Sequence, residues 1–257
     1  MIRLLQLSDL HFGPPYVEAA GDAILEHLKK HAFEAVIITG DLTQRARRKQ
    51  FVQARRFLEQ LSQNGRPLLV IPGNHDLPLF RIWERIFQPY HLYQSLISAE
   101  RNPVLEIPGL TVVGVDSTHP LLRISNGRLG TRKLEFIKKM FEKSPVGNFR
   151  IVALHHPLLF VQDSKLLSIF LDSKVDLVLS GHAHSRLTQK ISDSKGRSLL
   201  LAQCGTSSSS RGREGEVGKN SINEIVIDSD FVEVRLLELA ASLDFEKMQV
   251  EKYARTR

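Results

Sequence analysis

Clusters of Asp, Asn and His residues follow five apolar, strand-like runs of this sequence. The clusters read SDLH, GD, GNHD, HH and SGHAH, and each begins within two residues of the end of a run. They supply the candidate ligands Asp9, His11, Asp41, Asn74, His155, His182 and His184. Oxygen and nitrogen donors without thiolates are typical of sites for Mn, Fe or Zn. One ion does not need so many donors, whereas two ions sharing a bridging carboxylate would use them all.

The position of these clusters predicts that they meet at one place. In open α/β sheets, ligands bind beyond the carboxyl ends of the strands, so residues that are distant in the sequence can converge there. Within D-x-H and H-x-H, alternate side chains of an extended chain point the same way. We therefore expect both members of each pair to face one site.

The elements that must position these residues are predicted from apolar patterning. Runs rich in β-branched and aliphatic residues predict strands at 2–7, 35–39, 68–71, 110–115, 150–154, 175–179, 198–202, 222–227 and 231–237. Helical periodicity falls near 18–31, 45–63, 79–90, 131–143 and 163–173. The order is an α/β alternation that becomes rich in strands toward the end of the chain.

The chain is predicted to form a single domain over residues 1–243. Residues 74–109, with several prolines and short helical stretches, are expected to form a small insertion or cap over the sheet. The polar, glycine-rich segment 205–220 is expected to be a mobile surface loop. Residues 244–257 form a charged C-terminal tail, expected to be helical or partly disordered.

In their order along the chain, D-x-H, G-D, G-N-H-D, H and G-H-x-H, the five clusters resemble the pattern of the calcineurin-like metallophosphoesterases. The span from Asp9 to His184 covers over two thirds of the 257 residues. The resemblance implies an α/β (α+β) fold, a four-layer αββα sandwich of two mixed β-sheets flanked by helices. It also implies a site for two metal ions at the carboxyl ends of the strands.

The family pattern assigns a role to each ligand of this sequence. It implies that one metal is held by Asp9, His11 and His184, and that the second is held by Asn74, His155 and His182. Asp41 would bridge the two ions. The ions themselves would be divalent or transition metals, Mn, Fe or Zn.

The GNHD turn has two further roles in the family. The resemblance implies that His75 faces the substrate phosphate and stabilises or protonates the leaving group, with Asp76 supporting it. Gly73 is expected to let the backbone bend sharply enough to place Asn74 and His75 side by side.

Four further residues are candidates for contact with substrate. Arg45 and Arg47 follow Asp41 and could reach a second phosphate, although their basic segment can also be the solvated face of an amphipathic helix. His119, in GVDSTHP, ends a strand and could border the site. His156 is either substrate-facing or structural.

Several functions share such a site. The VDS and GRLG stretches, the latter within 126–130, resemble the class III cyclic-nucleotide phosphodiesterase branch, which implies hydrolysis of a phosphodiester of a small nucleotide-type substrate by a metal-bridging hydroxide. The alternatives are a UDP-2,3-diacylglucosamine pyrophosphatase, a DNA exonuclease, and a scaffold that has lost catalysis. Each alternative matches this chain less well. The main pyrophosphatase of this type carries Arg at the position of His75. The exonucleases are longer chains, and the scaffolds have lost metal ligands that this chain retains.

Composition limits the partners further. One cysteine, Cys204, excludes a disulfide framework and fits a reducing compartment. The N-terminal residues do not resemble a signal peptide, and no apolar window is long enough for a transmembrane segment, so a cytoplasmic location is expected. The net charge of +7 favours anionic partners such as a phosphorylated metabolite. It also allows contact with nucleic acid or a membrane face, which nothing else in the sequence indicates, and the oligomeric state cannot be predicted.

Overall fold

The first of two mixed sheets contains the N-terminal strand. The structure is a computed structural model and describes residues 1–123, 125–163, 165–212, 215 and 217–255. The strand order of this sheet is β12-β11-β10-β1-β2-β3. The strands are β1 (Ile2–Leu7), β2 (Ala35–Ile38), β3 (Leu68–Val70), β10 (Ser221–Ile227), β11 (Phe231–Leu239) and β12 (Phe245–Ala254). Strands β1, β2 and β3 are parallel, so their carboxyl ends lie at one edge.

The second sheet has the order β4-β5-β6-β7-β9-β8. Its strands are β4 (Val104–Ile107), β5 (Leu110–Val115), β6 (Phe149–Leu154), β7 (Leu177–Ser180), β8 (Leu187–Ser192) and β9 (Ser198–Gln203). The four central strands are parallel, and β4 and β8 are antiparallel strands at the two edges.

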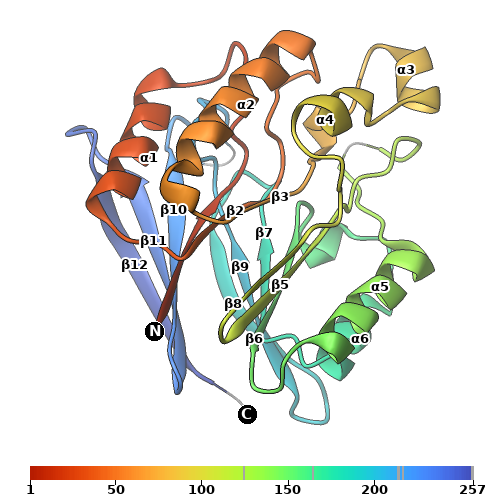
Figure 1. Cartoon of the computed structure of the whole chain (residues 1–257), viewed down its shortest axis with the longest axis vertical. Coiled ribbons are helices and arrows are strands. Elements are labelled where there is room, and N and C mark those ends of the chain that lie inside the picture. Colours follow the sequence, from red (N-terminus) through yellow and green to blue (C-terminus); the bar gives the residue numbers. More distant parts are fainter. Residues whose placement is uncertain (124, 164, 213–214, 216, 256–257) are drawn as a thin grey trace.

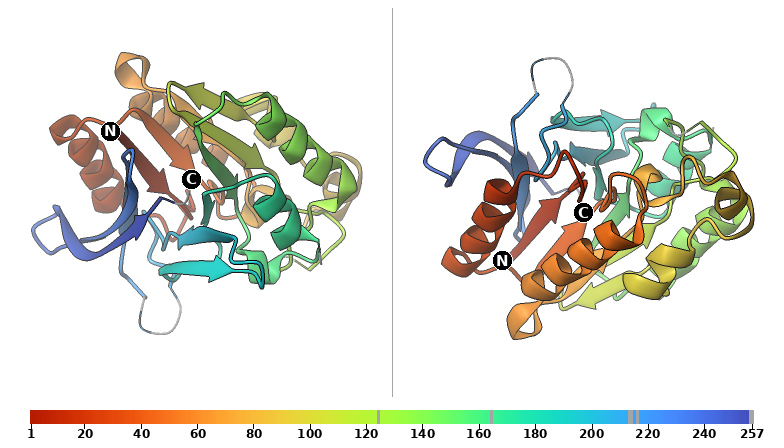
Figure 2. Two further views of the ribbon diagram at one scale, coloured as in Figure 1. Left: turned by 90° about the horizontal axis from the view of Figure 1, so that it is seen from below. Right: turned by 90° about the horizontal axis from the view of Figure 1, so that it is seen from above.

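The two sheets stack face to face, and helices cover their outer faces (Figures 1 and 2). The helices are α1 (Glu18–Lys30), α2 (Arg48–Leu61), α3 (Ile82–Phe87), α4 (His91–Leu96), α5 (Gly130–Lys143) and α6 (Leu166–Asp172). Helices α1 and α2 share one apolar cluster with the first sheet, and α5 and α6 share another with the second. A third cluster lies between the sheets. The expected four-layer αββα sandwich is therefore confirmed.

Successive side chains of a strand point to opposite faces, so the apolar residues of the central strands enter two different layers. In β1, Leu5 and Leu7 point toward the helices, whereas Leu4 points into the layer between the sheets. In β2, Val36 and Ile38 face the helices and Ile37 faces the other sheet. A strand that is buried on both faces reads as a continuous apolar run, which is why these strands were predicted with accurate bounds.

The segment 79–90 was predicted as one helix, but helical structure is interrupted there. Helix α3 ends at Phe87, and Gln88, Pro89 and Tyr90 separate it from α4. Proline disfavours a helical conformation of the residue before it, which explains the break. Helix α4 packs on α2, and its Tyr93 is fully buried and donates a hydrogen bond to the carbonyl oxygen of Val70 at 3.1 Å.

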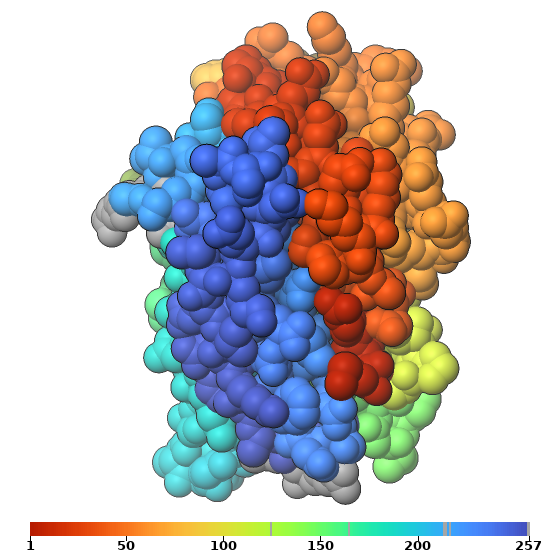
Figure 3. All heavy atoms as spheres, turned by 90° about the vertical axis from the view of Figure 1, so that its left-hand side faces the viewer, coloured from red at the N-terminus to blue at the C-terminus, as the bar shows by residue number. Residues whose placement is uncertain are grey.

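The segment from residue 245 is a strand, not the helix or partly disordered chain that was expected. Strand β12 pairs along its length with β11 and forms an edge of the first sheet, next to α1 (Figures 1 and 3). Most of its side chains are exposed, so its charged composition is that of an edge strand. Edge strands β4 and β8 were missed for the same reason.

Among the described helices, none is long and apolar enough to cross a membrane.

Candidate metal centre

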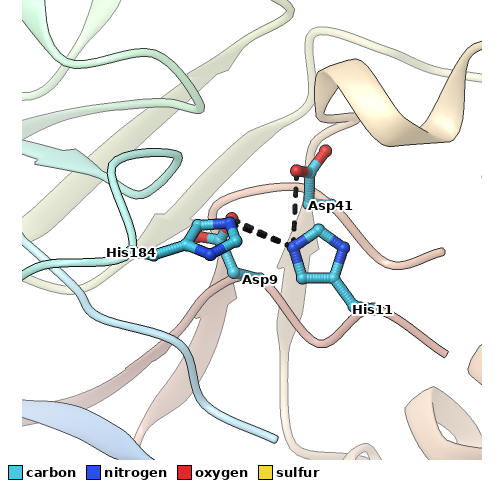
Figure 4. A group of neighbouring side chains, drawn as sticks. All are labelled: Asp9, His11, Asp41 and His184. Atoms are coloured by element: carbon cyan, nitrogen blue, oxygen red, sulfur yellow. Dashed lines mark hydrogen bonds and ion pairs between the residues drawn. The ribbon is translucent and has the colours of Figure 1, made fainter. Parts of the chain in front are cut away.

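The first group of predicted ligands comes together from the loops after β1 and β7 (Figure 4). Nε2 of His184 lies 3.1 Å from Nε2 of His11 and 3.1 Å from Oδ1 of Asp9. All three side chains are buried. Together with Asp41 they place ligand atoms within 4.8 Å of one another, as a metal site requires.

The second group comes from the ends of β3, β6 and β7. Oδ1 of Asn74 lies 2.9 Å from Nε2 of His155 and 2.8 Å from Nδ1 of His182. Asn74 belongs to a 3₁₀ turn, Asn74–Asp76, that begins four residues after β3. This group is also buried.

Asp41, at the end of β2, lies between the two groups. Its Oδ2 is 3.7 Å from Nε2 of His11 in the first group and 3.5 Å from Nε2 of His155 in the second. The structure thus brings all seven predicted ligands together, in the two groups that the sequence pattern implies. Strand ends from both sheets contribute, so the site lies where the edges of the two sheets meet.

Five of the seven residues have a left-handed backbone conformation. The φ angles are 53° at Asp9, 51° at His11, 54° at Asp41, 69° at His182 and 53° at His184. Residues other than glycine adopt this conformation uncommonly, and it is enriched at functional sites. The predicted reason for convergence, alternation along an extended chain, is therefore wrong: each D-x-H and H-x-H pair converges by turning twice.

Glycines at the site are required because other residues approach them closely. A Cβ atom on Gly73 would lie 2.2 Å from the backbone nitrogen of Asp41, and one on Gly181 would lie 1.7 Å from Oγ of Ser8. The φ of Gly73 is −106°, which any residue can adopt. The expectation that Gly73 permits a sharp bend is thus corrected: the residue is small so that Asp41 can pack against it.

The residues fit a bound cation. Oδ1 of Asp9 and Oδ2 of Asp41 are buried and, within the part of the chain described, accept no hydrogen bond. The other oxygen of each carboxylate is held by backbone N–H groups, since Oδ2 of Asp9 accepts from His182 at 2.9 Å and Oδ1 of Asp41 accepts from His75 at 2.7 Å. A buried anionic oxygen that accepts no hydrogen bond is unfavourable, and a metal ion would relieve it.

The orientation of His155 also fits a bound cation. Nδ1 of His155 donates to the carbonyl oxygen of Thr39 at 2.7 Å, which turns Nε2 toward Asn74. An imidazole held in this way directs Nε2 into the site, where its neutral form would offer a lone pair to a metal ion. Its neighbour, the amide oxygen of Asn74, also presents lone pairs, so a cation between them would satisfy both.

Electrostatics at the site compensates two buried carboxylates. Burial alone would raise the pKa of Asp41, but the charge of His155 holds it below its ordinary value. Burial alone would lower the pKa of His155, but Asp41 raises it to about 9. Burial opposes ionisation of Asp9 as well, yet His184 and His11 hold its pKa well below the usual range. The buried carboxylates therefore favour a positive charge beside them, here on His155.

His75 lies at the half-exposed side of the cluster. Its Nδ1 donates to the carbonyl oxygen of Gln44 at 2.9 Å, and its ring meets that of His11 edge to face with centroids 4.9 Å apart. Nε2 accepts a hydrogen bond from Nη1 of Arg211 at 3.1 Å. Burial is the main cause that lowers the pKa of His75 to about 4.

The hydrogen bonds of the Asp76 carboxylate go to the turn that carries His75 and to the turn after β2, so its supporting role toward His75 stays a prediction. Its carboxylate accepts hydrogen bonds from the backbone N–H groups of Gly73, Leu42 and Thr43 and from the Thr43 hydroxyl, at 2.8–3.1 Å. Asp76 thereby joins the turns after β2 and β3. The group that orients His75 is the carbonyl of Gln44.

His156 is fully buried beside the second group. Ser117 lies 2.8 Å from its Nδ1, and its ring centroid is 4.5 Å from that of His182. A Cβ atom on Gly127 would lie 2.8 Å from this ring, which explains the glycine of the NGRLG stretch. Of the two roles predicted for His156, the structural one fits this position.

The other predicted substrate contacts differ in position. Arg45 lines a small cavity with Asn74, His75 and Leu79. Arg47 is exposed just before α2. The Nδ1 of His119 accepts from the backbone of Leu121 at 3.2 Å, and no contact among the described residues joins His119 to the metal ligands.

Sequence analysis missed Arg211, which lies in the segment expected to be a mobile surface loop. The start of that segment is buried instead: Ser207 to Ser209 lie at 0% exposure. Ser207 donates its backbone N–H to Ser8 at 2.9 Å, and Ser210 donates to Pro15 at 2.8 Å. These contacts place Arg211 over His75, and the remainder of the predicted loop lies partly outside the described residues.

Comparison with known proteins gives a consistent assignment. The profile of the calcineurin-like phosphoesterase family matches residues 2–186. A protein from Synechococcus named "Probable cyclic nucleotide phosphodiesterase" is 28% identical over 210 residues, covering 73% of this chain and 75% of that protein. A 3′,5′-cyclic adenosine monophosphate phosphodiesterase from Haemophilus influenzae is 27% identical over 172 residues, covering 62% of this chain and 57% of that enzyme.

Solved structures share the fold at low identity. A purple acid phosphatase from yellow lupin matches with a TM-score of 0.73 and 14% identity, covering 99% of this chain and 54% of that one. GAP50 of Plasmodium matches with a TM-score of 0.65 and 14% identity, covering 100% of this chain and 89% of that one.

Proposed function

The chain belongs to the calcineurin-like phosphoesterase family, and on that premise we propose that it hydrolyses a phosphodiester of a small, nucleotide-type substrate with two divalent ions bound. As a member of this family it is a hydrolase of phosphoric esters. The observation that carries the proposal is the position of Asp41 between two groups of buried ligands. Relatives named as cyclic-nucleotide phosphodiesterases support the choice of a diester.

The seven ligands would hold the ions in the two groups described above. One ion would lie with Asp9, His11 and His184, the other with Asn74, His155 and His182, and Asp41 would bridge them. When bound, such ions polarise phosphate oxygens and lower the pKa of water so that hydroxide is available near neutral pH. The donor set suits Mn, Fe or Zn.

Beside the ligands, His75 is placed to exchange a proton with the leaving oxygen. The bond from Nδ1 to Gln44 fixes the ring and leaves Nε2 facing outward. An anionic phosphate beside Nε2 would favour its protonated form, because an opposite charge raises the pKa of an imidazole. General acid catalysis of this kind is typically worth about 10²- to 10⁴-fold in rate.

Arg211 supplies a cation at the same place. Its guanidinium contacts Nε2 of His75 and the side-chain oxygen of Gln44, both at 3.1 Å. A guanidinium binds phosphate oxygens through paired N–H groups. Arg211 would therefore transfer its hydrogen bond from His75 to the substrate phosphate, which would also free Nε2 for proton exchange.

The test is Mn²⁺-supported hydrolysis of bis(p-nitrophenyl) phosphate compared with p-nitrophenyl phosphate, followed by 3′,5′-cyclic AMP. We expect the diester to be preferred, and Asn74→Ala to lower its turnover by about 100-fold or more, since even groups that only support ligands change activity by roughly 10- to 100-fold. Gln53→Ala, on the exposed face of α2, is the matched control. Preference for the monoester by the metal-loaded wild-type protein would overturn the proposal.

A further inference from the structure

Helix α3 is amphipathic, but its apolar face is turned toward solvent and its polar face toward the protein. None of its six residues, all of them described, is buried. The side chains of Ile82, Trp83, Ile86 and Phe87 share one helical face and are 64%, 76%, 48% and 71% exposed. The rings of Trp83 and Phe87 stack with centroids 5.9 Å apart. The apolar face of this helix therefore points to solvent.

The polar face of α3 attaches it to the protein. Nε of Arg85 donates to the carbonyl oxygen of Pro120 at 2.7 Å, and its Nη1 donates to that of Pro78 at 3.1 Å. Nη2 of Arg81 donates to the carbonyl oxygen of Ala46 at 2.7 Å. Because arginines bind both ends of the helix to backbone carbonyls, the outward apolar face is part of the folded arrangement.

Neighbouring side chains enlarge the apolar surface. Phe80 is 76% exposed, and Leu121, next to the carbonyl that Arg85 binds, is 73% exposed. We call the following set the α3 patch: Phe80, Ile82, Trp83, Ile86, Phe87 and Leu121. Figure 1 shows α3 at the outer edge of the molecule, beyond α4. Contiguous exposed apolar patches of this kind mark interaction sites.

Cations flank the α3 patch. The guanidinium of Arg45 lies 5.4 Å from the centroid of the Phe80 ring. The bond from Arg81 to Ala46 brings the exposed residues Arg47, Arg48 and Lys49 close to the start of α3. No ion pair to these four cations occurs among the described residues, and the acid of α3, Glu84, pairs with Arg81 at 2.9 Å. The flank is therefore positively charged.

We propose that the α3 patch docks on an anionic lipid surface, with its aromatic rings in the interfacial layer and the 45–49 cations on lipid phosphates. Tryptophan and phenylalanine beside Lys and Arg are the composition of elements that lie on membranes. A second copy of this chain fits less well, because it would bring two cationic flanks together. This inference does not depend on the substrate proposed above.

Docking there would turn the catalytic site toward the lipid. Arg45 and Leu79 line the same small cavity as Asn74 and His75, and Arg45 also contacts the α3 patch. The half-exposed side of His75 is thus next to the surface that would meet the membrane.

The sole tryptophan of the chain, Trp83, makes the proposal directly testable. The full-length protein would be mixed with vesicles of phosphatidylglycerol and phosphatidylcholine, and with vesicles of phosphatidylcholine alone, at low and high salt. We expect a blue shift of tryptophan emission and co-sedimentation with the anionic vesicles, both weakened by salt. Absence of both effects at low salt would overturn the proposal.

Variants distinguish binding through the α3 patch from general electrostatic attraction of the protein to the vesicles. Phe80→Ser with Phe87→Ser, and Arg48→Glu with Lys49→Glu, should each weaken partitioning by roughly tenfold or more. The controls are Val146→Ser, at a side chain fully exposed elsewhere, and Arg132→Glu with Lys139→Glu on α5. An equal loss in patch and control variants would overturn the assignment to α3. A blue shift that grows with protein concentration without vesicles would identify a second copy as the occupant instead, and would equally overturn it.

Discussion

Nη1 of Arg211 lies 3.1 Å from Nε2 of His75, although 136 residues separate the two in sequence. The contact joins the segment after β9 to the turn after β3, directly over the candidate metal centre. It places a guanidinium where the phosphate of a substrate would be recognised.

Arg211→Ala is expected to lower kcat/KM for the diester by about 10- to 100-fold, mainly by raising KM. A hydrogen bond to a charged group contributes roughly 1.5–3 kcal/mol, and this one would be made to the bound phosphate. Arg211→Lys should restore part of the loss, because it keeps the charge without the paired N–H groups. Steady-state kinetics, with exposed Arg132→Ala as control, decide the matter, and an unchanged KM would rule the role out.

Substitution of Asp76 should mainly lower stability, whereas substitution of His75 should mainly lower kcat. Asp76→Ala leaves three buried backbone N–H groups without their acceptor, so we expect the free energy of unfolding to fall by about 3 kcal/mol. Asp76→Asn, which keeps one acceptor oxygen, should lose less. His75→Ala should lower kcat by about 10²- to 10⁴-fold while changing the unfolding free energy by about 1 kcal/mol or less. Urea unfolding and kinetics on the same preparations measure both, and the reverse pattern would contradict these roles.

Gly73→Ala is expected to remove metal binding as well as activity. Its Cβ would have to displace Asp41, which approaches to 2.2 Å, and Asp41 is the residue between the two ligand groups. Gly147→Ala is a suitable control, since a Cβ there meets nothing within 4 Å and its φ of 87° adds only a backbone penalty of about 1–2 kcal/mol. Metal content of the purified variants, measured by mass spectrometry, should separate them. Normal metal content in Gly73→Ala would show that the site adapts.

Stability in acid should depend on Glu224, which lies in β10 far from the metal ligands. Burial alone would raise its pKa, but the hydrogen bond with His27 and the charges of Arg3 and Arg235 lower it from 4.5 to about 2. Because the folded pKa is below the unfolded one, the stabilisation is complete above pH 4.5 and is lost as the pH falls toward 2. The difference in unfolding free energy between wild type and Glu224→Gln should therefore shrink between pH 5 and pH 3. Exposed Glu142→Gln should show no such trend, and a constant difference for Glu224→Gln would refute the linkage.

Strands and ligands with a strong local signal could be predicted from the sequence. Strands β1 and β5 have the predicted bounds, because strands buried on both faces are apolar throughout. The ligand groups were predicted because each follows a strand end and matches a known family pattern. The conformation that brings them together, with left-handed φ at Asp9 and His184, has no sequence signal, since tertiary packing imposes it.

What escaped prediction depends on contacts between distant segments. Arg211 lies in a serine- and glycine-rich stretch whose local composition is that of a loop, and tertiary contacts such as the bonds from Ser207 to Ser8 and from Ser210 to Pro15 bring it to the site. Strand β12 was obscured by its charged residues, which suit an edge strand but also suit a solvated tail. The family pattern assigned Asp76 a role beside His75, but its hydrogen bonds to the turn after β2 have no signal in the sequence.

The left-handed backbone at five ligand positions sets stability against activity. Each such residue is held in a conformation that costs an L-amino acid roughly 1–2 kcal/mol. The folded protein therefore carries a strain that lowers its stability relative to the unfolded chain. Glycine at Asp9 or His184 would relieve that strain and abolish a ligand in the same step. Substitutions that stabilise the protein are thus expected to be concentrated among those that inactivate it, a trade-off located in the very turns that carry the chemistry.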